Sequence, residues 1–208
     1  SQKKASKAQS SGRLAEEIIP IKIPQGKKET ILFEHDEFIK GNTSLEVLGK
    51  LRTVFKKEGG TVTAGNSSGL NDGAAAMLLA SDKGIKENNL TPIAKILSSA
   101  VVGVEPRIMG IGPVKASNKA LKKAGLKMDD IDIIELNEAF AAQSLYVIRK
   151  GGWDIEKLNV NGGAIALGHP IGASGTRILV TLIHEMIRQN KAKGCATLCI
   201  GGGMGIAI

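Results

Sequence analysis

Two reactive residues of the sequence stand in unusual backbone surroundings. His169 lies between Gly168 and Pro170, in a stretch that holds five glycines over residues 162–175. Proline restricts the preceding residue to an extended backbone, which constrains the direction of the imidazole. Cys199 comes two residues before three consecutive glycines, whose uncovered N–H groups can face an oxyanion. A histidine and a cysteine in such settings are suited to proton transfer and acyl transfer.

A third polar residue, Asn137, directly follows the strand that we expect over residues 131–136. Asparagine is a frequent helix N-cap, and it would cap a helix that we expect over residues 138–149. The same amide can also hold a water molecule that donates a hydrogen bond to a developing negative charge. The two interpretations do not exclude each other.

The other cysteine, Cys195, lies four residues before Cys199 in an apolar run. On a strand, four residues separate the side chains by about 13 Å, which is too far for a disulfide. Neither cysteine has the neighbouring cysteine or histidine of a zinc site. The stretch 162–175 also departs from the spacing of the dinucleotide-binding fingerprint. We therefore expect no metal, no nicotinamide cofactor and a reducing compartment, the cytoplasm.

The elements that must position these residues alternate between strands and helices, which predicts an α/β fold. Gly125 is expected to end one helix in a left-handed conformation. The expected elements of the C-terminal part are strands over 93–102, 131–136 and 158–161, helices over 114–124, 138–149 and 174–189, and a hairpin of 196–200 with 204–208.

The N-terminal part reads less regularly. We expect a polar helix within 1–17 and two short strands within 18–34 around a turn at 25–27. Thr43 with Glu46 forms a capping-box pattern and predicts a helix that ends at 59–60. A loop, a short helix and a strand are expected over 61–82, and the helix and strand should lie within 70–91.

Composition excludes several classes of protein. The 208 residues are 42% hydrophobic and 23% charged, as in ordinary globular proteins, so fibrous and disordered classes are out. No apolar run reaches the roughly 18 residues of a membrane helix. Aromatic residues make up only 3%, and no RNA-binding motif is present, which argues against nucleic acid. The net charge of +8 fits either solubility or an anionic small ligand.

Five blocks of the sequence, in this order, resemble the thiolase family. They are Thr-Ala-Gly-Asn-Ser-Ser-Gly-Leu-Asn-Asp-Gly-Ala at 63–74, Met-Gly-Ile-Gly-Pro at 109–113, Asn-Glu-Ala-Phe at 137–140, Gly-His-Pro-Ile-Gly-Ala-Ser-Gly at 168–175 and Cys-Ile-Gly-Gly-Gly-Met-Gly at 199–205. The resemblance is closest to the acetyl-CoA acetyltransferase members. It implies a thiolase-like fold, with a mixed sheet layered with helices.

The resemblance also implies roles for residues in these blocks. His169 would activate the nucleophile and, with a water held by Asn137, stabilise the thioester oxygen. Cys199 would be the general acid and base at the acetyl Cα, and the N–H of Gly201 would help form an oxyanion hole. The residues expected to bind substrate are Ser68 at the pantetheine arm, Met109 and Phe140 at the acyl pocket, and Lys40 near the nucleotide phosphates.

The resemblance covers only about the second half of a family member. We therefore expect a substrate-covering loop domain over 1–69, a segment over 70–91 that returns to the N-terminal domain, and a C-terminal domain over 92–208. The cysteine that becomes acylated has no counterpart here, so this chain alone should be inactive. The implied partners are acetyl-CoA, acetoacetyl-CoA, CoA, the other half of the enzyme and further copies in a dimer or tetramer. Coenzyme A thioesters are substrates, and no other cofactor is implied.

Three alternatives remain open. The first is that the chain belongs to a degradative 3-ketoacyl-CoA thiolase that acts on longer acyl chains, and the second is that it is a non-catalytic CoA-binding fragment. A β-ketoacyl synthase is a more distant choice, because its site pattern uses two histidines.

Overall fold

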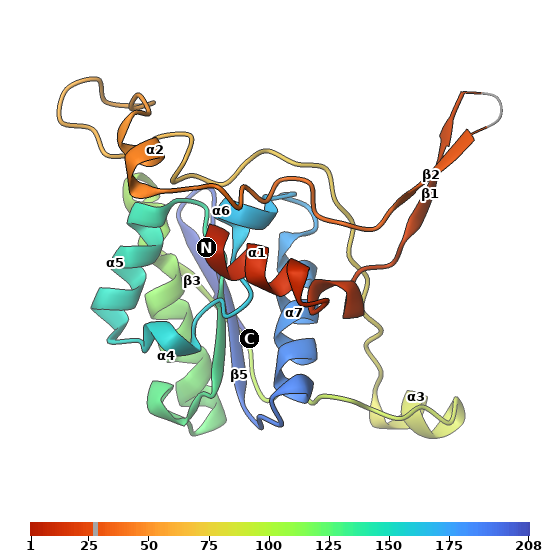
Figure 1. Ribbon diagram of the computed structural model, residues 1–208. Helices are drawn as coiled ribbons and strands as arrows, with labels where there is room; N and C mark the ends of the chain where they lie inside the picture. Colours follow the sequence, from red (N-terminus) through yellow and green to blue (C-terminus); the bar gives the residue numbers. More distant parts are fainter. Residues whose placement is uncertain (27–28) are drawn as a thin grey trace.

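A four-stranded mixed sheet lies at the centre of the computed structural model, which describes residues 1–26 and 29–208 (Figure 1). Its strand order is β3-β6-β5-β4. The two central strands β5 and β6 pair antiparallel, β3 joins β6 antiparallel, and β4 joins β5 parallel. The strands are β3 Ala100–Gly103, β4 Ile133–Leu136, β5 Gly194–Ile200 and β6 Met204–Ala207. The predicted α/β class, the mixed sheet and the C-terminal hairpin are confirmed.

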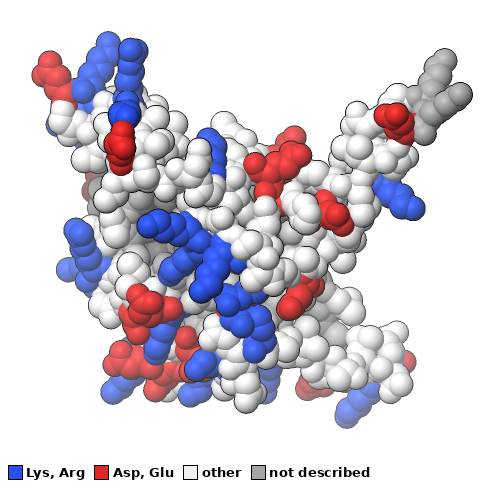
Figure 2. Space-filling model, in the orientation of Figure 1, with Lys and Arg blue, Asp and Glu red and all other residues white. Residues whose placement is uncertain are grey.

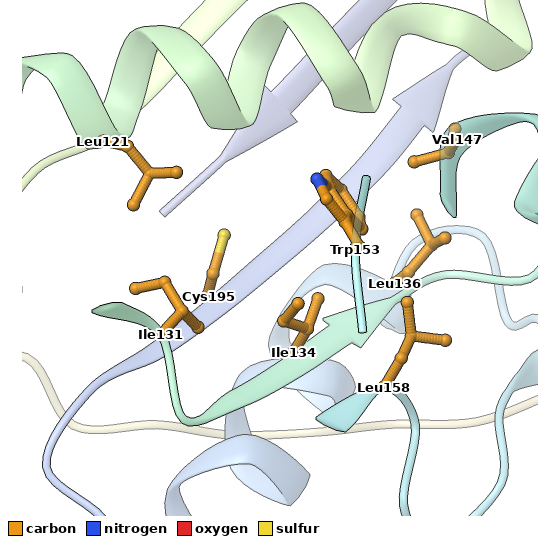
Figure 3. Packing of buried hydrophobic residues seen from close by; sticks show 8 residues of the cluster. All are labelled: Leu121, Ile131, Ile134, Leu136, Val147, Trp153, Leu158 and Cys195. Atoms are coloured by element: carbon orange, nitrogen blue, oxygen red, sulfur yellow. The ribbon is translucent and has the colours of Figure 1, made fainter. Parts of the chain in front are cut away.

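Helices cover both faces of the sheet. On one face lie α4 (Gly112–Ala124) and α5 (Ala141–Gly151), and α7 (Ser174–Arg188) covers the other. Figure 3 shows the first face, where a buried cluster joins both helices to β4 and β5. The cluster comprises Leu121, Ile131, Ile134, Leu136, Val147, Trp153, Leu158 and Cys195. Each large apolar side chain buried there contributes about 1.5–3 kcal/mol to stability. The cluster therefore holds β4 firmly against α4 and α5.

The alternation of side chains along β4 separates the two faces. Ile134 and Leu136 point to α4 and α5, whereas Ile133 packs against Ile178 and Leu182 of α7. Because strand side chains alternate, every second residue from Ile133 faces α7.

The three helices predicted in the C-terminal part are present, although α5 begins at Ala141 and not at residue 138. Gly125 ends α4 at φ +69°, a left-handed conformation that favours glycine. The other elements of this part are the 3-10 helices η2 Pro106–Ile111, η3 Met128–Asp130 and η4 Ile155–Lys157, and the short helix α6 Ala164–Leu167.

The N-terminal part lies over the C-terminal part and extends beyond it (Figure 1). The predicted hairpin within 18–34 is present and projects outward, but Lys27 of its expected turn lies outside the described residues. The elements of this part are α1 Gln2–Ser10, η1 Leu14–Glu16, β1 Ile21–Gln25, β2 Glu29–Phe33, α2 Leu45–Gly49 and α3 Asp82–Glu87.

The helix expected from Thr43 to residues 59–60 is mostly absent. It is reduced to α2, and its cap is Ser44, whose side chain accepts a hydrogen bond from the N–H of Val47. The apolar stripe that predicted a longer helix stays uncovered, with Phe55 73% exposed. Helix formation in proteins depends on packing of such a face, so without it the chain leaves the helix after one turn.

Two expected strands are also wrong in extent. Residues 70–81 contain no regular element, and of the run 93–102 only the end belongs to β3. These segments have no neighbouring strand to complete their backbone hydrogen bonds, and Leu78 and Ile93 are more than 70% exposed. The strand expected at 158–161 is only a bridge between Leu158 and Ile134. Within the described residues, no helix has the length and apolar character needed to cross a membrane.

Candidate functional site

Asn137 continues the strand instead of capping a helix. Its N–H donates to the carbonyl oxygen of Thr197 on β5 at 3.0 Å, so the backbone is still paired to the sheet there. Helix α5 begins only after Phe140, which makes no side-chain cap. The helix-cap interpretation of Asn137 is therefore wrong, because the helix begins four residues later and Phe140 occupies its N-cap position.

The side chain of Asn137 contacts His169. Its Nδ2 lies 3.3 Å from Nε2 of the imidazole, and the asparagine is fully buried. Asn137 Oδ1 is also buried and has no hydrogen-bond partner among the described residues. Buried polar atoms are nearly always paired, so this oxygen is suited to accept a hydrogen bond from a water or a ligand.

Asn137 and Ser174 contact the two ring nitrogens of His169. The Ser174 hydroxyl oxygen lies 2.6 Å from Nδ1 and 3.0 Å from the carbonyl oxygen of Pro170. Because the Asn137 Nδ2 group is a donor, Nε2 beside it accepts, and Nδ1 carries the proton and donates to Ser174. The lone pair of the neutral ring is thus on Nε2, the atom beside Asn137.

Burial lowers the pKa of His169 below its ordinary value, and the nearby charge of Arg177 lowers it further. The histidine is therefore neutral near pH 7 and can accept a proton at Nε2.

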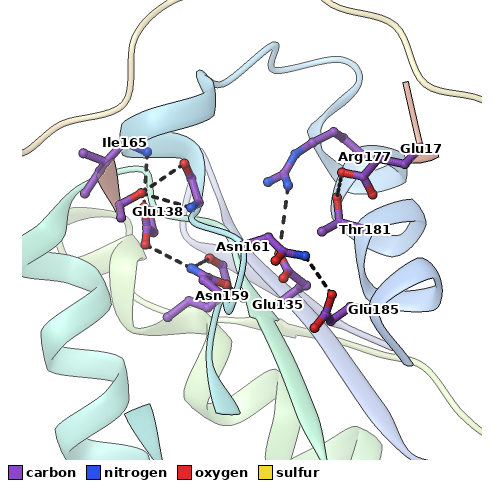
Figure 4. A network of polar contacts seen from close by, with 12 residues as sticks. Glu17, Glu135, Glu138, Asn159, Asn161, Ile165, Arg177, Thr181 and Glu185 are labelled. Carbon is purple, nitrogen blue, oxygen red and sulfur yellow. Dashed lines mark hydrogen bonds and ion pairs between the residues drawn. The ribbon is translucent and has the colours of Figure 1, made fainter. Parts of the chain in front are cut away.

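Asn159 and Glu138 hold the end of β4 in place (Figure 4). The Asn159 side chain substitutes for a neighbouring strand: its Oδ1 accepts from the N–H of Leu136 and its Nδ2 donates to the carbonyl of Leu136, both at 2.8 Å. The same Nδ2 donates to Glu138 at 3.1 Å, and the other Glu138 oxygen accepts from the N–H of Ile165 in α6. The residues on both sides of Asn137 are thereby fixed.

The segment 66–71 contacts both the loop after Asn137 and the loop that carries His169. Ser68 donates twice to the carbonyl oxygen of Ala139, from its backbone N–H at 3.0 Å and from its hydroxyl at 3.1 Å. The N–H of His169 donates to the carbonyl of Gly69 at 3.1 Å. Gly168, at φ +95°, leaves no room for a side chain, because a Cβ there would lie 2.4 Å from an oxygen of Asn71. Ser68 thus contacts the loop that follows Asn137, and its neighbour Gly69 contacts His169.

Cys199 lies on the strand next to Asn137. It is two residues beyond Thr197 near the end of β5, opposite Gly205 of β6, and it precedes the exposed turn that contains Gly201. Burial raises the pKa of its thiol, so the thiol is protonated near pH 7.

Cys195 is unlike Cys199. It is 3% exposed in the core cluster, and burial raises its pKa to about 11, so it remains an inert thiol. The described residues contain no group of three or more histidines, cysteines or carboxylates placed to hold a metal ion.

The remaining expected substrate-binding residues lie on three separate segments of the chain. Phe140 bridges to Ser67 and packs edge-on against Phe55, with 6.0 Å between ring centroids. Met109 lies half-buried in η2, which packs on α5. The exposed Lys40 holds its ammonium 5.2 Å from the ring centroid of Phe38.

Positive charge gathers over α1 on the face shown in Figure 2. Helix α1 supplies Lys3, Lys4 and Lys7. Lys4 is used internally, because its ammonium donates to the carbonyl oxygens of Leu158 and Ile155. It helps to bind α1 to the C-terminal part of the chain.

Sequence reasoning missed Ser174, Asn159 and the role of Glu138. Ser174 stood in the block at 168–175, and its position one turn after Pro170 was a usable signal. Asn159 gave no signal, since its contact with Leu136 spans 23 residues and needs a φ of +44°.

The fold and this site together define a class of protein. Residues 90–208 match the thiolase C-terminal domain and residues 1–83 match the thiolase N-terminal domain. The chain therefore belongs to the thiolase family.

Individual relatives agree with the family. The chain is 58% identical, over its whole length, to an acetyl-CoA acetyltransferase of Chromobacterium violaceum, and covers 53% of that protein. It is 57% identical to an acetyl-CoA acetyltransferase of Escherichia coli, covering 52%. The crystal structure of the Bacillus anthracis acetyl-CoA acetyltransferase superposes on the whole chain with a TM-score of 0.95 at 47% identity, and 52% of it is covered. Human mitochondrial 3-ketoacyl-CoA thiolase gives 0.91 at 46% identity, over 99% of this chain and 51% of its own. The chain thus spans about half the length of the curated relatives it matches.

Proposed function

We propose that this chain is the C-terminal part of an acetyl-CoA C-acetyltransferase. The full enzyme joins two acetyl-CoA into acetoacetyl-CoA and CoA and catalyses the reverse thiolysis. The observation that supports this is the contact between Asn137 and His169 beside the strand that carries Cys199. A neutral histidine, a protonated thiol and a buried unpartnered amide oxygen are the groups that condensation of two thioesters needs.

The starting protonation states suit the first half-reaction. Nε2 of His169 takes the proton from the thiol of the cysteine that becomes acylated. That sulfur bonds to the carbonyl carbon of acetyl-CoA, and the carbon–sulfur bond to CoA breaks. The Cys199 thiol gives its proton to the departing CoA thiolate. His169 is then an imidazolium and Cys199 a thiolate.

The second half-reaction returns both residues to their starting states. The Cys199 thiolate takes a proton from the methyl group of a second acetyl-CoA. The enolate oxygen accepts hydrogen bonds from His169 Nε2–H and from a water held by Asn137 Oδ1. The enolate carbon bonds to the acyl carbon, and the cysteine sulfur leaves and recovers its proton from His169. The N–H of Gly201 contributes to the oxyanion hole of the tetrahedral intermediates.

Substrate binding is assigned to the residues around this centre. Ser68 contacts the pantetheine arm, Met109 and Phe140 line the acyl pocket, and Lys40 lies near the nucleotide phosphates. The position of Ser68 against Ala139 supports its role, because it lies beside the loop that carries Asn137.

The acylated cysteine is assigned to a part of the protein outside these 208 residues. Cys195 is buried and inert, and Cys199 is needed for proton transfer. Support comes from the half-length coverage of the relatives and from uncovered apolar side chains between 70 and 97, where Leu70 is 89% exposed. We assign 1–69 to a loop domain, 70–91 to the N-terminal domain and 92–208 to the C-terminal domain. A homo-oligomer in the cytoplasm completes the proposal, and the two free thiols agree with a reducing compartment.

A chimera tests the proposed function. These 208 residues replace the corresponding stretch of the Chromobacterium violaceum relative, to which they are 58% identical. Acetoacetyl-CoA thiolysis and acetyl-CoA condensation are measured for the chimera, for the chain alone and for that relative. We expect activity in the chimera and none in the chain alone. Cys199→Ala in the chimera should lower condensation by at least about 100-fold, as expected for loss of a general acid and base.

Three outcomes would contradict the proposal. Turnover by the chain alone would show that no further cysteine is needed. An inactive chimera beside an active relative would indicate a non-catalytic CoA-binding protein. Faster thiolysis of long-chain 3-ketoacyl-CoA than of acetoacetyl-CoA would favour the degradative alternative.

A further inference from the structure

A buried ion pair lies next to the site and has no role in the steps above. Glu135 is at the centre of β4 and its side chain is completely buried. Arg177 belongs to the start of α7, and its Nη1 lies 3.9 Å from Glu135 Oε2 (Figure 4). The pair therefore spans the gap between the sheet and the helix that covers it.

The pair is poorly suited to stabilise the fold. Both carboxylate oxygens of Glu135, and Nε and Nη1 of Arg177, are buried without a hydrogen-bond partner within the described residues. A buried ion pair without such hydrogen bonds rarely repays its desolvation, and apolar side chains of similar volume usually do as well. The same two elements use an apolar contact two residues earlier, where Ile133 packs against Ile178 and Leu182.

The position of the Glu135–Arg177 pair relative to His169 suggests a role in the site. Glu135 is two residues before Asn137, so both start from the strand face that looks toward α7. Arg177 is three residues after Ser174, so both lie on one face of α7. Asn137 and Ser174 are the two side chains that contact His169 at its two ring nitrogens. Asn137 directly follows β4, and Ser174 belongs to α7. The Glu135–Arg177 pair thus connects the same two elements, β4 and α7, that position the two side chains in contact with His169.

We propose that Glu135 and Arg177 are positioning residues that set the distance between the Asn137 amide and His169. The other contacts between α7 and β4 within the described residues are the apolar ones of Ile133 with Ile178 and Leu182, which are non-directional and leave Ser174 free to shift against Asn137. The kinetic part of this inference rests on the proposed function, and its spectroscopic part does not.

The charge of Arg177 gives a readout that a purely structural role would not move. Burial raises the pKa of the three carboxyl groups that face Arg177, those of Glu135 (to about 8), Glu17 (to about 7) and Asp36, and the charge of Arg177 opposes the rise in each. Burial lowers the pKa of His169, and the charge of Arg177 lowers it further. Removal of the guanidinium must therefore raise the pKa of the histidine, whereas replacement of Glu135 by a neutral side chain must not.

The test uses the chimera and three variants: Arg177→Met, which keeps the volume, Arg177→Lys, which keeps the charge, and Glu135→Gln. The kcat and KM of thiolysis are measured, and His169 is titrated by NMR of labelled histidine, assigned with His169→Gln. For Arg177→Met we expect kcat to fall by about 10- to 100-fold with little change in KM, since small misplacements act on the chemical step. Its histidine should titrate at higher pH, and Arg177→Lys should restore that titration. Glu135→Gln should lower kcat without raising the titration.

Arg188→Met provides the matched control. Arg188 pairs with the buried Glu185 at the other end of α7, so its loss also leaves a buried carboxylate on this helix. This variant should keep both kcat and the titration of His169. The inference is overturned if Arg177→Met retains wild-type kcat and histidine titration, or if Arg188→Met matches its losses. An inactive wild-type chimera would refute the proposed function alone, because the NMR signals of the His169 ring in the variants still report whether its contact with Asn137 is kept.

Discussion

The hydroxyl of Ser174 is the partner of Nδ1 of His169, at 2.6 Å. With the donor Nδ2 of Asn137 beside Nε2, the imidazole carries its proton on Nδ1 and its lone pair on Nε2, and the Ser174 oxygen accepts from Nδ1. The residue is 1% exposed, so no water competes for the contact.

We predict that Ser174→Ala lowers kcat in the chimera by about 10- to 100-fold, because His169 then loses the acceptor of its Nδ1–H. NMR of the two ring nitrogens should show the proton shared between Nδ1 and Nε2. The control is Ser144→Ala, which removes another buried serine, from α5. Unchanged kcat and an unchanged tautomer in Ser174→Ala would contradict the assignment.

The end of β4 depends on the side chain of Asn159. Its amide makes the two hydrogen bonds with Leu136 that a neighbouring strand would otherwise provide. This explains why the strand expected at 158–161 is only a bridge. One asparagine at φ +44° takes the place of a strand and leaves the loop beyond it free to approach the site.

We predict that Asn159→Ala lowers the free energy of unfolding by about 2–4 kcal/mol, because two buried groups of Leu136 lose their partners. Urea unfolding measures the change. Asn190→Ala tests the contribution of the backbone, since Asn190 also has a positive φ, +50°, but is exposed after α7. A loss in Asn159→Ala no larger than in Asn190→Ala would show that the hydrogen bonds contribute little.

Elements with a local cause could be predicted from the sequence. The hairpin of β5 and β6 and the helices α4 and α7 carry their own periodicity and end signals, and they form as expected. The helix expected from Thr43 and the strand expected within 70–91 require partners, and sequence periodicity does not reveal whether a partner is present. The site shows the same division: His169 and Asn137 were predicted, whereas Asn159 depends on a long-range contact.

At the scale of the whole molecule, polar contacts join the first 17 residues to the C-terminal part of the chain. Ser1 in front of α1 exchanges hydrogen bonds with the backbone of Gly163, and Glu17 accepts one from Thr181 of α7 at 3.0 Å. Segment 1–17 is therefore bound to Gly163 and Thr181, which lie before and after His169 in the sequence. The carboxyl group of Glu17 makes this attachment sensitive to pH.

We predict that the stability of the chain falls between pH 5 and pH 8, and that Glu17→Gln reduces this fall by about 2 kcal/mol. Burial raises the pKa of Glu17 from 4.5 to about 7. Between these values the folded chain keeps a proton that the unfolded chain has lost, so the stabilisation is complete below pH 4.5 and is lost as the pH rises through 7. Urea unfolding at pH 5 and pH 8 measures the slope. Glu16→Gln, at an exposed neighbour, should keep the wild-type slope, and an equal slope in Glu17→Gln would mean that this carboxyl group is ionised in the folded protein.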